Sequence, residues 1–430
     1  MVRPVAYDVT RLATRLLNRT PNGIDRIDSA FAQHFISSAC SDRFGLMMTP
    51  LGPRAFSAQA ARDVIAGIAT HWRENDTSEQ DESYDRIIAW LSNPAQKRPA
   101  SGRISRNRPG RVGKVLRWMG RHGPTLGRDL SSTLPKDAVY LNVSQFPLWI
   151  ESYFGWLKQR PDIRPVFFIH DLLPLEVPEY FRKSEYERHH RRLANLARFG
   201  AAAIVTTQVV RTALERHLSE LGRTDMPILV APIPAASTFS RKGVLDPELP
   251  KHPYFVVCST IEPRKNHLML LQVWRELMRR DGESAPKLIV VGQRGWENEN
   301  VIDLLERCQT IRNHVFEVSG LSTPGLKQLL DGARALLMPS FAEGYGLPVV
   351  EALAANVPVI ASDIPVFHEI GGGRITAISP INGEKWLDAI RSFAAVGRTD
   401  RSADLIADDG HGQPKWETYF PAIEAFLETL

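Results

Sequence analysis

One stretch of the chain, residues 341–362, constrains the fold more than any other; it reads FAEGYGLPVVEALAANVPVIAS. The run ARALLMPS at 333–340 precedes it and has the pattern of a short strand that is buried on both faces. Within the stretch, VPVIAS at 357–362 is a second such run, and the segment between them reads as a loop followed by a helix. Two strands joined through a helix form a βαβ unit, so this region predicts a parallel sheet.

The loop and the helix carry groups that suit a nucleotide sugar. Pro348 falls in the first helical turn, where proline is tolerated, and Gly344 and Gly346 allow a tight backbone approach. The first amides of the helix favour an anion such as a phosphate. Glu343 and Glu351 suit hydroxyl groups instead, because a carboxylate accepts their hydrogen bonds. Taken singly, Glu351 also fits a solvated helix residue and Glu343 a loop charge.

Apolar runs alternate with helical segments along much of the chain. At 430 residues the chain is too long for one compact core, so we expect two domains. Residues 1–235 form the first Rossmann-like half, with a polar, basic insertion at about 51–135, and residues 250–410 form the second. The proline-rich segment 232–253 is the expected linker. The predicted strands fall in 5–12, 138–144, 165–171, 201–207, 226–232, 254–260, 287–293, 314–320, 333–340 and 357–362.

Composition excludes several protein classes. The three cysteines, Cys40, Cys258 and Cys308, are widely spaced, which argues against a disulfide scaffold or a structural zinc site. No apolar run approaches the roughly 20 residues needed to cross a bilayer. The first residues, MVRPVAYDVTRL, lack the apolar core of a signal peptide. We therefore expect a cytoplasmic protein.

The net charge of +5 is concentrated in one block. Between Lys97 and Arg128 the chain has ten Lys and Arg residues and no Asp or Glu. Within the block, VGKVLRWMGRHG at 112–123 interleaves apolar and cationic residues, so it suits an anionic membrane surface. A helix packed on its own domain is an equally open interpretation. Nucleic acid is disfavoured as a partner because no series of stacking aromatic residues accompanies the charge.

Two further segments place polar residues directly after predicted strands. In STIEPRKNH at 259–267, Arg264 and Lys265 stand at a strand-to-helix junction, where open α/β sheets bind ligands. Together they suit a diphosphate, although a solvated basic turn with Asn266 as an ordinary helix cap is the alternative. His170, in FFIHDLLPL, follows an apolar strand and could face a cleft or serve a structural role.

The absence of common motifs narrows the chemistry. The chain has no Asp-x-Asp to present a divalent cation to a diphosphate, no second histidine to complete a zinc-protease motif with His368 and Glu369, and neither GxSxG nor a P-loop.

Four segments, in order, resemble retaining glycosyltransferase family 4. They are Gly-Ile-x-Arg from Gly23 to Arg26, HDLLPL, EPRKN, and EGYGLPVVE with two glutamates eight positions apart. The resemblance runs from about residue 5 to the final helix, except for 51–135. VGQRGWE at 291–297 and GLSTPGLKQLL at 320–330 are similar to the bacterial enzymes of O-antigen, capsule and exopolysaccharide synthesis.

The resemblance implies an α/β GT-B fold, two Rossmann-like parallel-sheet domains facing across a cleft, with the final helix, 411–430, crossing back to the first domain. It implies that Lys265 and Arg264 hold the donor diphosphate, that Glu343 hydrogen-bonds the donor sugar and that His170 lies near the reacting carbon. The remaining donor-binding residues that it implies are Gly23, Glu351, Gly344, Tyr345, Gly346 and Leu347. It implies no metal and no other cofactor.

The implied reaction transfers a mannose- or glucose-type hexose from a GDP- or UDP-sugar to a lipid-linked or growing glycan, with retention by front-face attack. The protein would act at the inner face of the inner membrane. Two alternatives stay open, a sugar-nucleotide epimerase or phosphorylase of the same fold and a non-enzymatic scaffold of a polysaccharide assembly. Asn356 stands where relatives commonly have glycine, and we expect it to adopt the same left-handed turn. Residues 371–380 depart from the family pattern and are left unassigned.

Overall fold

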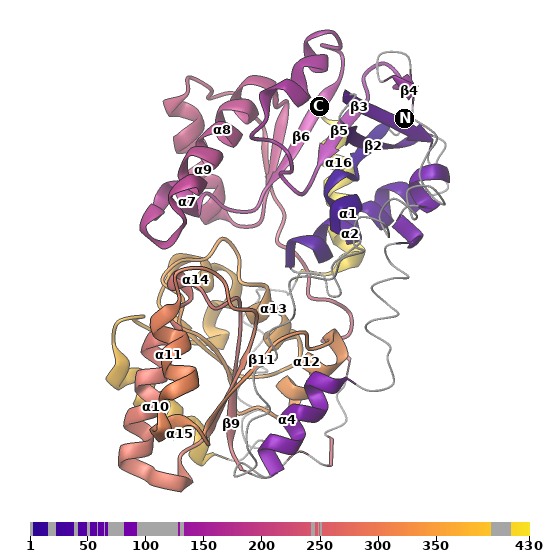
Figure 1. The fold of residues 1–430 in the computed structure, drawn as a ribbon. Coiled ribbons are helices and arrows are strands. Elements are labelled where there is room, and N and C mark those ends of the chain that lie inside the picture. The colour runs from indigo at the N-terminus through magenta and orange to yellow at the C-terminus, as the bar shows by residue number, and fades with distance from the viewer. Residues whose placement is uncertain are drawn as a thin grey trace.

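Two α/β domains lie one above the other in the computed structural model of the chain (Figure 1). The structure describes residues 3–15, 23–37, 42–49, 52–57, 59–63, 65–67, 81–92, 128–129, 133–241, 246–247, 249, 252–396 and 414–430. Most of the basic block, residues 97–127, lies outside these ranges, so its predicted membrane role stays a prediction.

The first domain is built on an eight-stranded sheet with the order β4-β3-β2-β1-β5-β6-β7-β8. From β2 to β8 neighbouring strands are parallel, whereas β3 and β4 add antiparallel strands at one edge. The strands are β1 Val5–Asp8, β2 Arg43–Thr49, β3 Gly52–Ser57, β4 Arg128–Asp129, β5 Val139–Asn142, β6 Arg164–Ile169, β7 Ala202–Val205 and β8 Ile228–Val230.

The second domain has a six-stranded sheet with the order β11-β10-β9-β12-β13-β14, and every pair in it is parallel. The strands are β9 Tyr254–Cys258, β10 Lys287–Val291, β11 Val315–Val318, β12 Leu336–Met338, β13 Val359–Ser362 and β14 Ile375–Ile378. The order reverses between β9 and β12, whose carboxyl ends therefore meet at a switch point, the usual ligand site of such sheets.

Helices join the parallel strands and cover both faces of each sheet. In the first domain they are α1 Thr10–Arg15, α2 Gly23–Ser37, α7 Leu173–Glu176, α8 Lys183–Phe199 and α9 Gln208–Glu220. In the second they are α10 His267–Asp281, α11 Glu299–Arg307, α12 Thr323–Gly332, α13 Leu347–Ala354, α14 Pro365–Gly371 and α15 Gly383–Ala395. Two more helices are α4 Glu82–Ser92, which packs on the second domain, and α16 Trp416–Glu428, which packs on the first.

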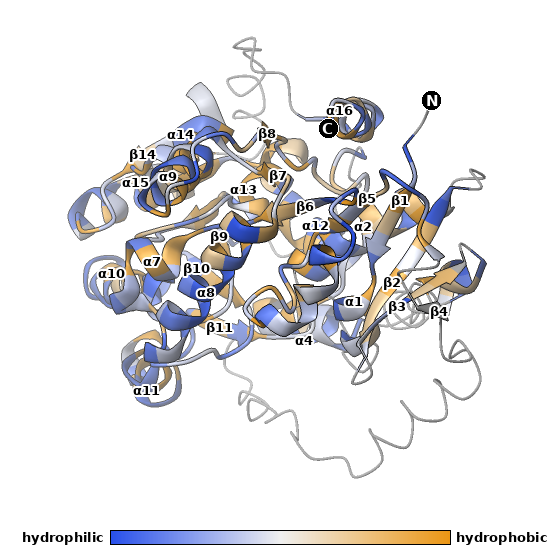
Figure 2. Ribbon diagram, turned by 90° about the horizontal axis from the view of Figure 1, so that it is seen from above, coloured by the Kyte–Doolittle hydropathy of each residue, from blue (hydrophilic) through white to orange (hydrophobic). Residues whose placement is uncertain are grey.

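The strands are apolar on both sides because both faces of each sheet are buried. Along β1, Val5 and Tyr7 face one hydrophobic cluster and Ala6 faces another. Along β9, Val256 and Phe255 likewise point to opposite sides. Figure 2 shows the hydrophobic strands at the centre and the hydrophilic sides of the helices toward the outside. This burial is why the strands could be predicted as continuous apolar runs.

The helix α4 packs on the second domain although it lies in the sequence between β3 and β4 of the first sheet (Figure 1). Its Trp90 stacks on Phe316 of β11 with the ring centroids 5.1 Å apart. The ammonium of Lys287 lies over the Trp90 ring and donates a 3.1 Å hydrogen bond to the Leu91 carbonyl. The insertion was predicted to elaborate the first domain, and this part of it instead completes the second.

The last helix, α16, returns to the first domain and packs beside α2. The Phe31 ring of α2 meets the rings of Tyr419 and Phe420 at 5.8 and 5.4 Å. Trp416 donates a 2.9 Å hydrogen bond to the carbonyl of Ala235 in the linker. Linker and tail are thus joined next to the first sheet.

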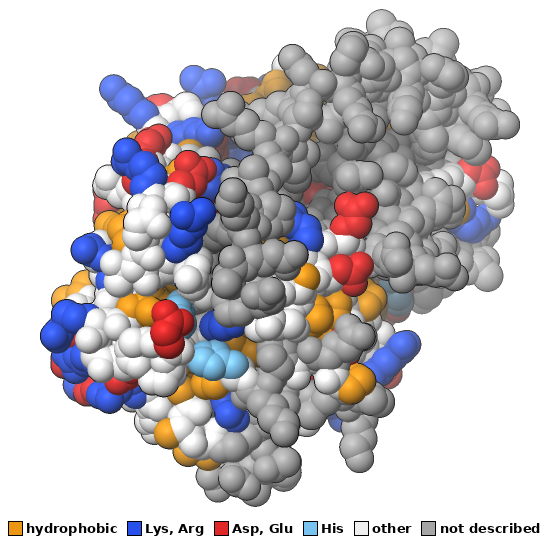
Figure 3. Space-filling view, turned by 60° about the horizontal axis from the view of Figure 1, so that its bottom comes forward, with side chains coloured by type: hydrophobic (Ala, Val, Ile, Leu, Met, Phe, Trp, Pro, Cys, Tyr) orange, Lys and Arg blue, Asp and Glu red, His pale blue; other side chains and the backbone are white. Residues whose placement is uncertain are grey.

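The described part of the lower face carries positive and negative side chains in alternation (Figure 3). On α10, for example, Arg280 and Glu276 form an ion pair. Of the helices in the described ranges, none is both long enough and apolar enough to span a membrane.

Candidate active site

Two loops of the second domain form the core of the site, one following β9 and the other following β12. Because these strands are neighbours, the loops touch, and the backbone N–H of Phe341 donates a 2.8 Å hydrogen bond to the Arg264 carbonyl. Asn266 begins α10 with a left-handed φ of 56° and makes no side-chain cap. Its amide instead donates to the carbonyls of Pro339 and Pro380 at 3.1 and 2.8 Å. The interpretation of Asn266 as an ordinary cap was therefore wrong, since it fastens the two loops together.

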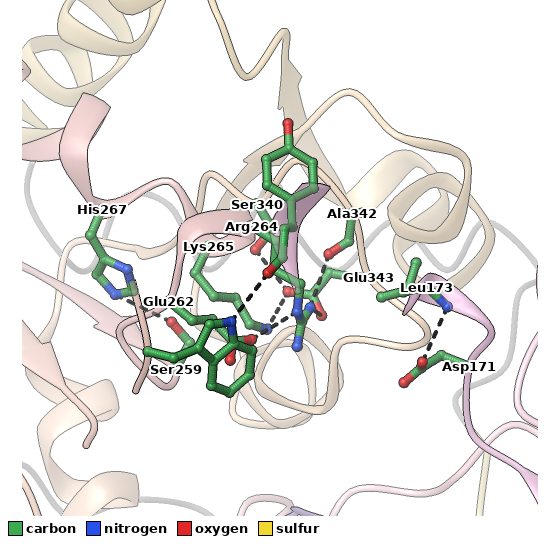
Figure 4. Close-up of polar contacts among 12 residues, drawn as sticks. Asp171, Leu173, Ser259, Glu262, Arg264, Lys265, His267, Ser340, Ala342 and Glu343 are labelled. Atoms are coloured by element: carbon green, nitrogen blue, oxygen red, sulfur yellow. Dashed lines mark hydrogen bonds and ion pairs between the residues drawn. The ribbon is translucent and has the colours of Figure 1, made fainter. Parts of the chain in front are cut away.

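Glu343 lies between two cations from the other loop (Figure 4). Lys265 Nζ is 2.5 Å from Glu343 Oε1, and Arg264 Nη1 is 2.9 Å from Oε2. Ser340 donates a 2.7 Å hydrogen bond to Oε1. All of these charged side chains are largely buried, so Arg264 and Lys265 do not form the solvated turn that was the alternative interpretation.

A second carboxylate, which the sequence reasoning did not single out, balances the charge of this cluster. Glu262 Oε1 is 2.7 Å from Arg264 Nε, so two buried cations face two buried carboxylates. Burial raises the pKa of Glu343, but Lys265 and Arg264 outweigh this and bring that pKa to about 2. Burial lowers the pKa of Arg264, but Glu343 and Glu262 raise it above its ordinary value. Burial raises the pKa of Glu262, and burial and Arg264 lower the pKa of Lys265. Glu343 and Arg264 are therefore ionised, and mutual contacts fix the side chains of the cluster.

The glycine turn before α13 is shaped by close neighbours. Gly346 has a φ of 108°, and a Cβ there would lie 2.8 Å from Phe367. A Cβ on Gly344 would lie 2.5 Å from the Asp171 side chain and 2.7 Å from the His170 carbonyl oxygen, both in the first domain. Tyr345 donates a 2.6 Å hydrogen bond to the Ile233 carbonyl of the linker, so its hydroxyl holds the turn rather than facing open space. The following residue, Leu347, begins α13 and packs against the core.

Glu351 projects from α13 and is paired across the domain boundary. Arg26 Nη1 of α2 is 2.7 Å from Glu351 Oε1. Glu351 is 1% exposed, which excludes the interpretation of a solvated helix residue. Burial raises its pKa, with the Arg26 guanidinium opposing that effect.

His170 follows β6 and donates a 2.8 Å hydrogen bond from Nε2 to the Val143 carbonyl, which can only accept. Burial lowers its pKa to about 4, partly opposed by that hydrogen bond. Its ring is therefore neutral near pH 7. Gly23 begins α2, and among the residues that the structure describes nothing would lie within 4 Å of a Cβ there.

Further contacts close the two domains around these residues, and sequence reasoning missed them. Glu369 of α14 accepts hydrogen bonds from the backbone N–H groups of Gln208 and Val209, which begin α9, at 2.5 and 3.1 Å. Thr206 donates a 3.1 Å hydrogen bond to the Gly344 carbonyl.

An aromatic contact adds to this closure. The rings of Tyr180 and Phe341 stack at 5.3 Å, 5° from parallel, and Trp296 donates to the Tyr180 carbonyl at 3.3 Å. Trp296 falls in VGQRGWE, the one sequence signal that could have pointed to this contact. Among the described residues, no group of three or more His, Cys, Asp or Glu is arranged to hold a metal ion.

Comparison with known proteins agrees with this geometry. Residues 246–396 match a family model described as glycosyl transferases group 1. The serotype-specific mannosyltransferase WbdA of Escherichia coli is 30% identical over 220 residues, which cover 47% of this chain and 26% of that protein. The O-antigen chain mannosyltransferase B of Escherichia coli is 32% identical over 154 residues, covering 36% of this chain and 39% of that protein. The chain thus spans about a quarter of the first relative's length.

A solved structure extends the likeness across both domains. Anabaena Alr3699/HepE, crystallised in complex with UDP, superposes with a TM-score of 0.53 at 18% identity and covers 68% of this chain and 79% of that chain. The predicted GT-B fold, with two sheets that are mainly parallel, is confirmed.

Proposed function

We propose that this chain, whose residues 246–396 match the family model of glycosyl transferases group 1, transfers a hexose from a nucleotide diphosphate sugar to a glycan acceptor. The acceptor is a lipid-linked or growing glycan of O-antigen, capsule or exopolysaccharide synthesis. Two relatives named as mannosyltransferases favour mannose as the sugar. The proposed site of action is the cytoplasmic face of the inner membrane.

The observation that carries the proposal is the buried cluster of Lys265, Arg264 and Glu343 at the carboxyl ends of β9 and β12. A fixed ammonium and guanidinium suit the two phosphates of a sugar nucleotide, because charge-assisted hydrogen bonds are strong in such a site. The carboxylate between them suits the hydroxyl groups of the transferred sugar. The amides that begin α13 lie in the same loop and add donors for the β-phosphate.

In the proposed reaction, the bond between the sugar C1 and the β-phosphate oxygen breaks while an acceptor hydroxyl oxygen bonds to C1 from the same face. The acceptor proton passes to the departing phosphate oxygen. Lys265 and Arg264 stabilise the charge that develops on that phosphate. Glu343 is not a nucleophile in this scheme, because both of its oxygens are held by the two cations. The proposed chemistry uses these side-chain cations and requires no metal ion.

His170 and Gly23 are assigned to the first-domain side of the reaction. The backbone carbonyl of His170 lies beside the Gly344 turn, through which the donor sugar would reach the acceptor, and the ring of His170 is neutral. Gly23, at the start of α2, leaves room for the approach of phosphate or acceptor. The basic block from Lys97 to Arg128 is assigned to an anionic membrane surface on the strength of its sequence.

The test mixes the purified full chain with radiolabelled UDP- and GDP-hexoses and a bacterial membrane lipid extract. We expect a labelled glycolipid from the unaltered protein and none from Glu343→Gln. Glu424→Gln is the control, because this glutamate pairs with Arg43 outside the cluster. The anomeric configuration of the product, read by NMR, tests retention.

Two outcomes would contradict the proposal. Unreduced transfer by Glu343→Gln would refute the assigned site. Conversion of the nucleotide sugar into a different, intact nucleotide sugar without any acceptor would identify an epimerase instead.

A further inference from the structure

We infer that Arg26 is a positioning residue that holds Glu351 ready for the ribose of the donor and thereby couples nucleotide binding to contact between the domains. The inference rests on the proposed function, since it requires a nucleotide sugar in the site. It goes beyond that function by giving a first-domain side chain a part in recognising a ligand of the second domain.

The two glutamates of the 341–362 segment are held in different ways. Glu343 is fixed by Arg264, Lys265 and Ser340, all within its own domain. Among the described residues, Glu351 forms an ion pair with Arg26 alone, which comes from α2 of the first domain. Glu343 is therefore positioned whether or not the domains touch, whereas Glu351 is positioned when they do.

Arg26 stands on a rigid support. It lies in the first turn of α2, and further along that helix Phe31 packs edge-on against Phe168 of the first sheet and against Tyr419 and Phe420 of α16. Burial and Glu351 raise the pKa of the Cys258 thiol at the end of β9, and Arg26 and Lys265 oppose that effect.

The ion pair leaves Glu351 able to bind a sugar hydroxyl. Arg26 approaches Oε1, and an ionised carboxylate has about four acceptor positions over its two oxygens. Burial raises the pKa of Glu351, and the Arg26 guanidinium opposes that effect. The ion pair thus favours the carboxylate form, which accepts hydrogen bonds from ribose hydroxyls.

The test compares ribose recognition in matched variants by calorimetry. The titrations use UDP and GDP and their 2′-deoxy and 3′-deoxy forms. The proteins compared are the wild type, Arg26→Gln, Arg26→Lys and Glu369→Gln. Glu369→Gln removes a different interdomain contact that does not touch Glu351. Thermal unfolding of each variant shows whether it is folded.

We expect the wild type to bind the ribonucleotide about 10- to 100-fold more tightly than at least one deoxy form, the range for a hydrogen bond to a charged group. In Arg26→Gln the preference for the ribonucleotide over the deoxy form should fall to about twofold or less, and Arg26→Lys should restore part of that preference. Glu369→Gln should keep the wild-type ratio even where its affinity changes. In turnover, Arg26→Gln should raise the donor KM more than it lowers kcat.

If the Arg26→Gln variant is folded and keeps the wild-type ratio of ribonucleotide to deoxynucleotide affinity, the inference is overturned and the proposed function still stands. Loss of the ratio in Glu369→Gln as well would also overturn it, because any loosened domain contact would then suffice. A wild type that binds neither nucleotide would instead refute the proposed donor, and with it the inference.

Discussion

Glu369 and Gln208 join the two domains, because the Glu369 carboxylate accepts a 2.5 Å hydrogen bond from the Gln208 backbone N–H at the start of α9. The second oxygen of the carboxylate accepts from Val209. A carboxylate at a helix N-terminus satisfies unpaired amides and meets the positive end of the helix dipole. In this protein the carboxylate comes from the opposite domain.

Replacing Glu369 with Gln should weaken this contact by about 0.5–2 kcal/mol, the range for losing a helix cap. Hydrogen exchange at the amides of Gln208 and Val209 should become faster. Glu215→Gln is the control, since this glutamate is on the same helix but pairs with Arg211 in its own domain. Unchanged exchange in Glu369→Gln would show that solvent or another group replaces the carboxylate.

Lys265→Met should lower kcat by about 10²–10³-fold, the range for removing one donor that stabilises developing charge. It should also cost about 3–5 kcal/mol of stability, because it breaks a buried ion pair. The matched control is Lys327→Met, since Lys327 forms a similarly buried pair with Asp331 on α12, 2.6 Å apart. Steady-state turnover and urea unfolding should show that both variants lose stability and that Lys265→Met alone loses activity. Equal losses of turnover would refute the catalytic assignment.

His170 should make the protein less stable as the pH falls. Its pKa is about 4 when folded against 6.5 for an ordinary histidine, so between these values the unfolded state binds more protons. The contribution of His170 to the free energy of unfolding is therefore complete above pH 6.5. It falls by about 3 kcal/mol as the pH declines toward 4. His267, with a pKa lowered by burial to about 3, acts in the same direction.

Urea unfolding between pH 5 and 6.5 isolates this effect. His170→Gln should reduce the pH slope of the free energy of unfolding by about 1.4 kcal/mol per pH unit. His190→Gln, on the exposed face of α8, should keep the wild-type slope. A slope unchanged by His170→Gln would mean that His170 is not neutral in the folded protein.

Trp90→Ala should destabilise the second domain although Trp90 lies between two strands of the first. Removing its stack on Phe316 and its cover over Lys287 should cost about 3–5 kcal/mol. Hydrogen exchange along β11 should therefore speed up. Trp149→Ala, which removes a half-exposed ring beside Arg188 and Arg192 of the first domain, should leave β11 unchanged. If the amides of β11 in Trp90→Ala exchange hydrogen as slowly as in the wild type, α4 is dispensable to that sheet.

Apart from β2, the sequence predicted the central strands of both sheets, because those strands are buried on both faces and are therefore apolar throughout. The interior strand β2, Arg43–Thr49, was missed. The sequence also did not predict β14, whose residues Ile375–Ile378 are partly exposed at a sheet edge and follow three glycines. The antiparallel strands β3 and β4 were also missed, since β3 is mixed in polarity and β4 has two residues. The left-handed turn expected at Asn356 is confirmed by its φ of 54°.

In the site, local motifs were sufficient to predict the loops that hold Lys265 and Glu343, because adjacent parallel strands bring their carboxyl ends together. They were not sufficient for the pairing of Glu351 with Arg26, which depends on how two domains meet. Glu262 and Glu369 were missed because a lone glutamate in a sequence resembles a solvated charge. Only packing distinguishes a buried glutamate from an exposed one.

Because α4 packs on the second domain, that domain consists of two separate segments of the chain rather than one continuous segment. Residues 246–396 hold all six strands of its sheet, yet the edge at β11 is finished by Glu82–Ser92. An exchange of donor domains between relatives would have to move both pieces together. Such a chimera, built with and without residues 81–92, would show whether sugar-nucleotide specificity is inherited through one segment of the gene or two.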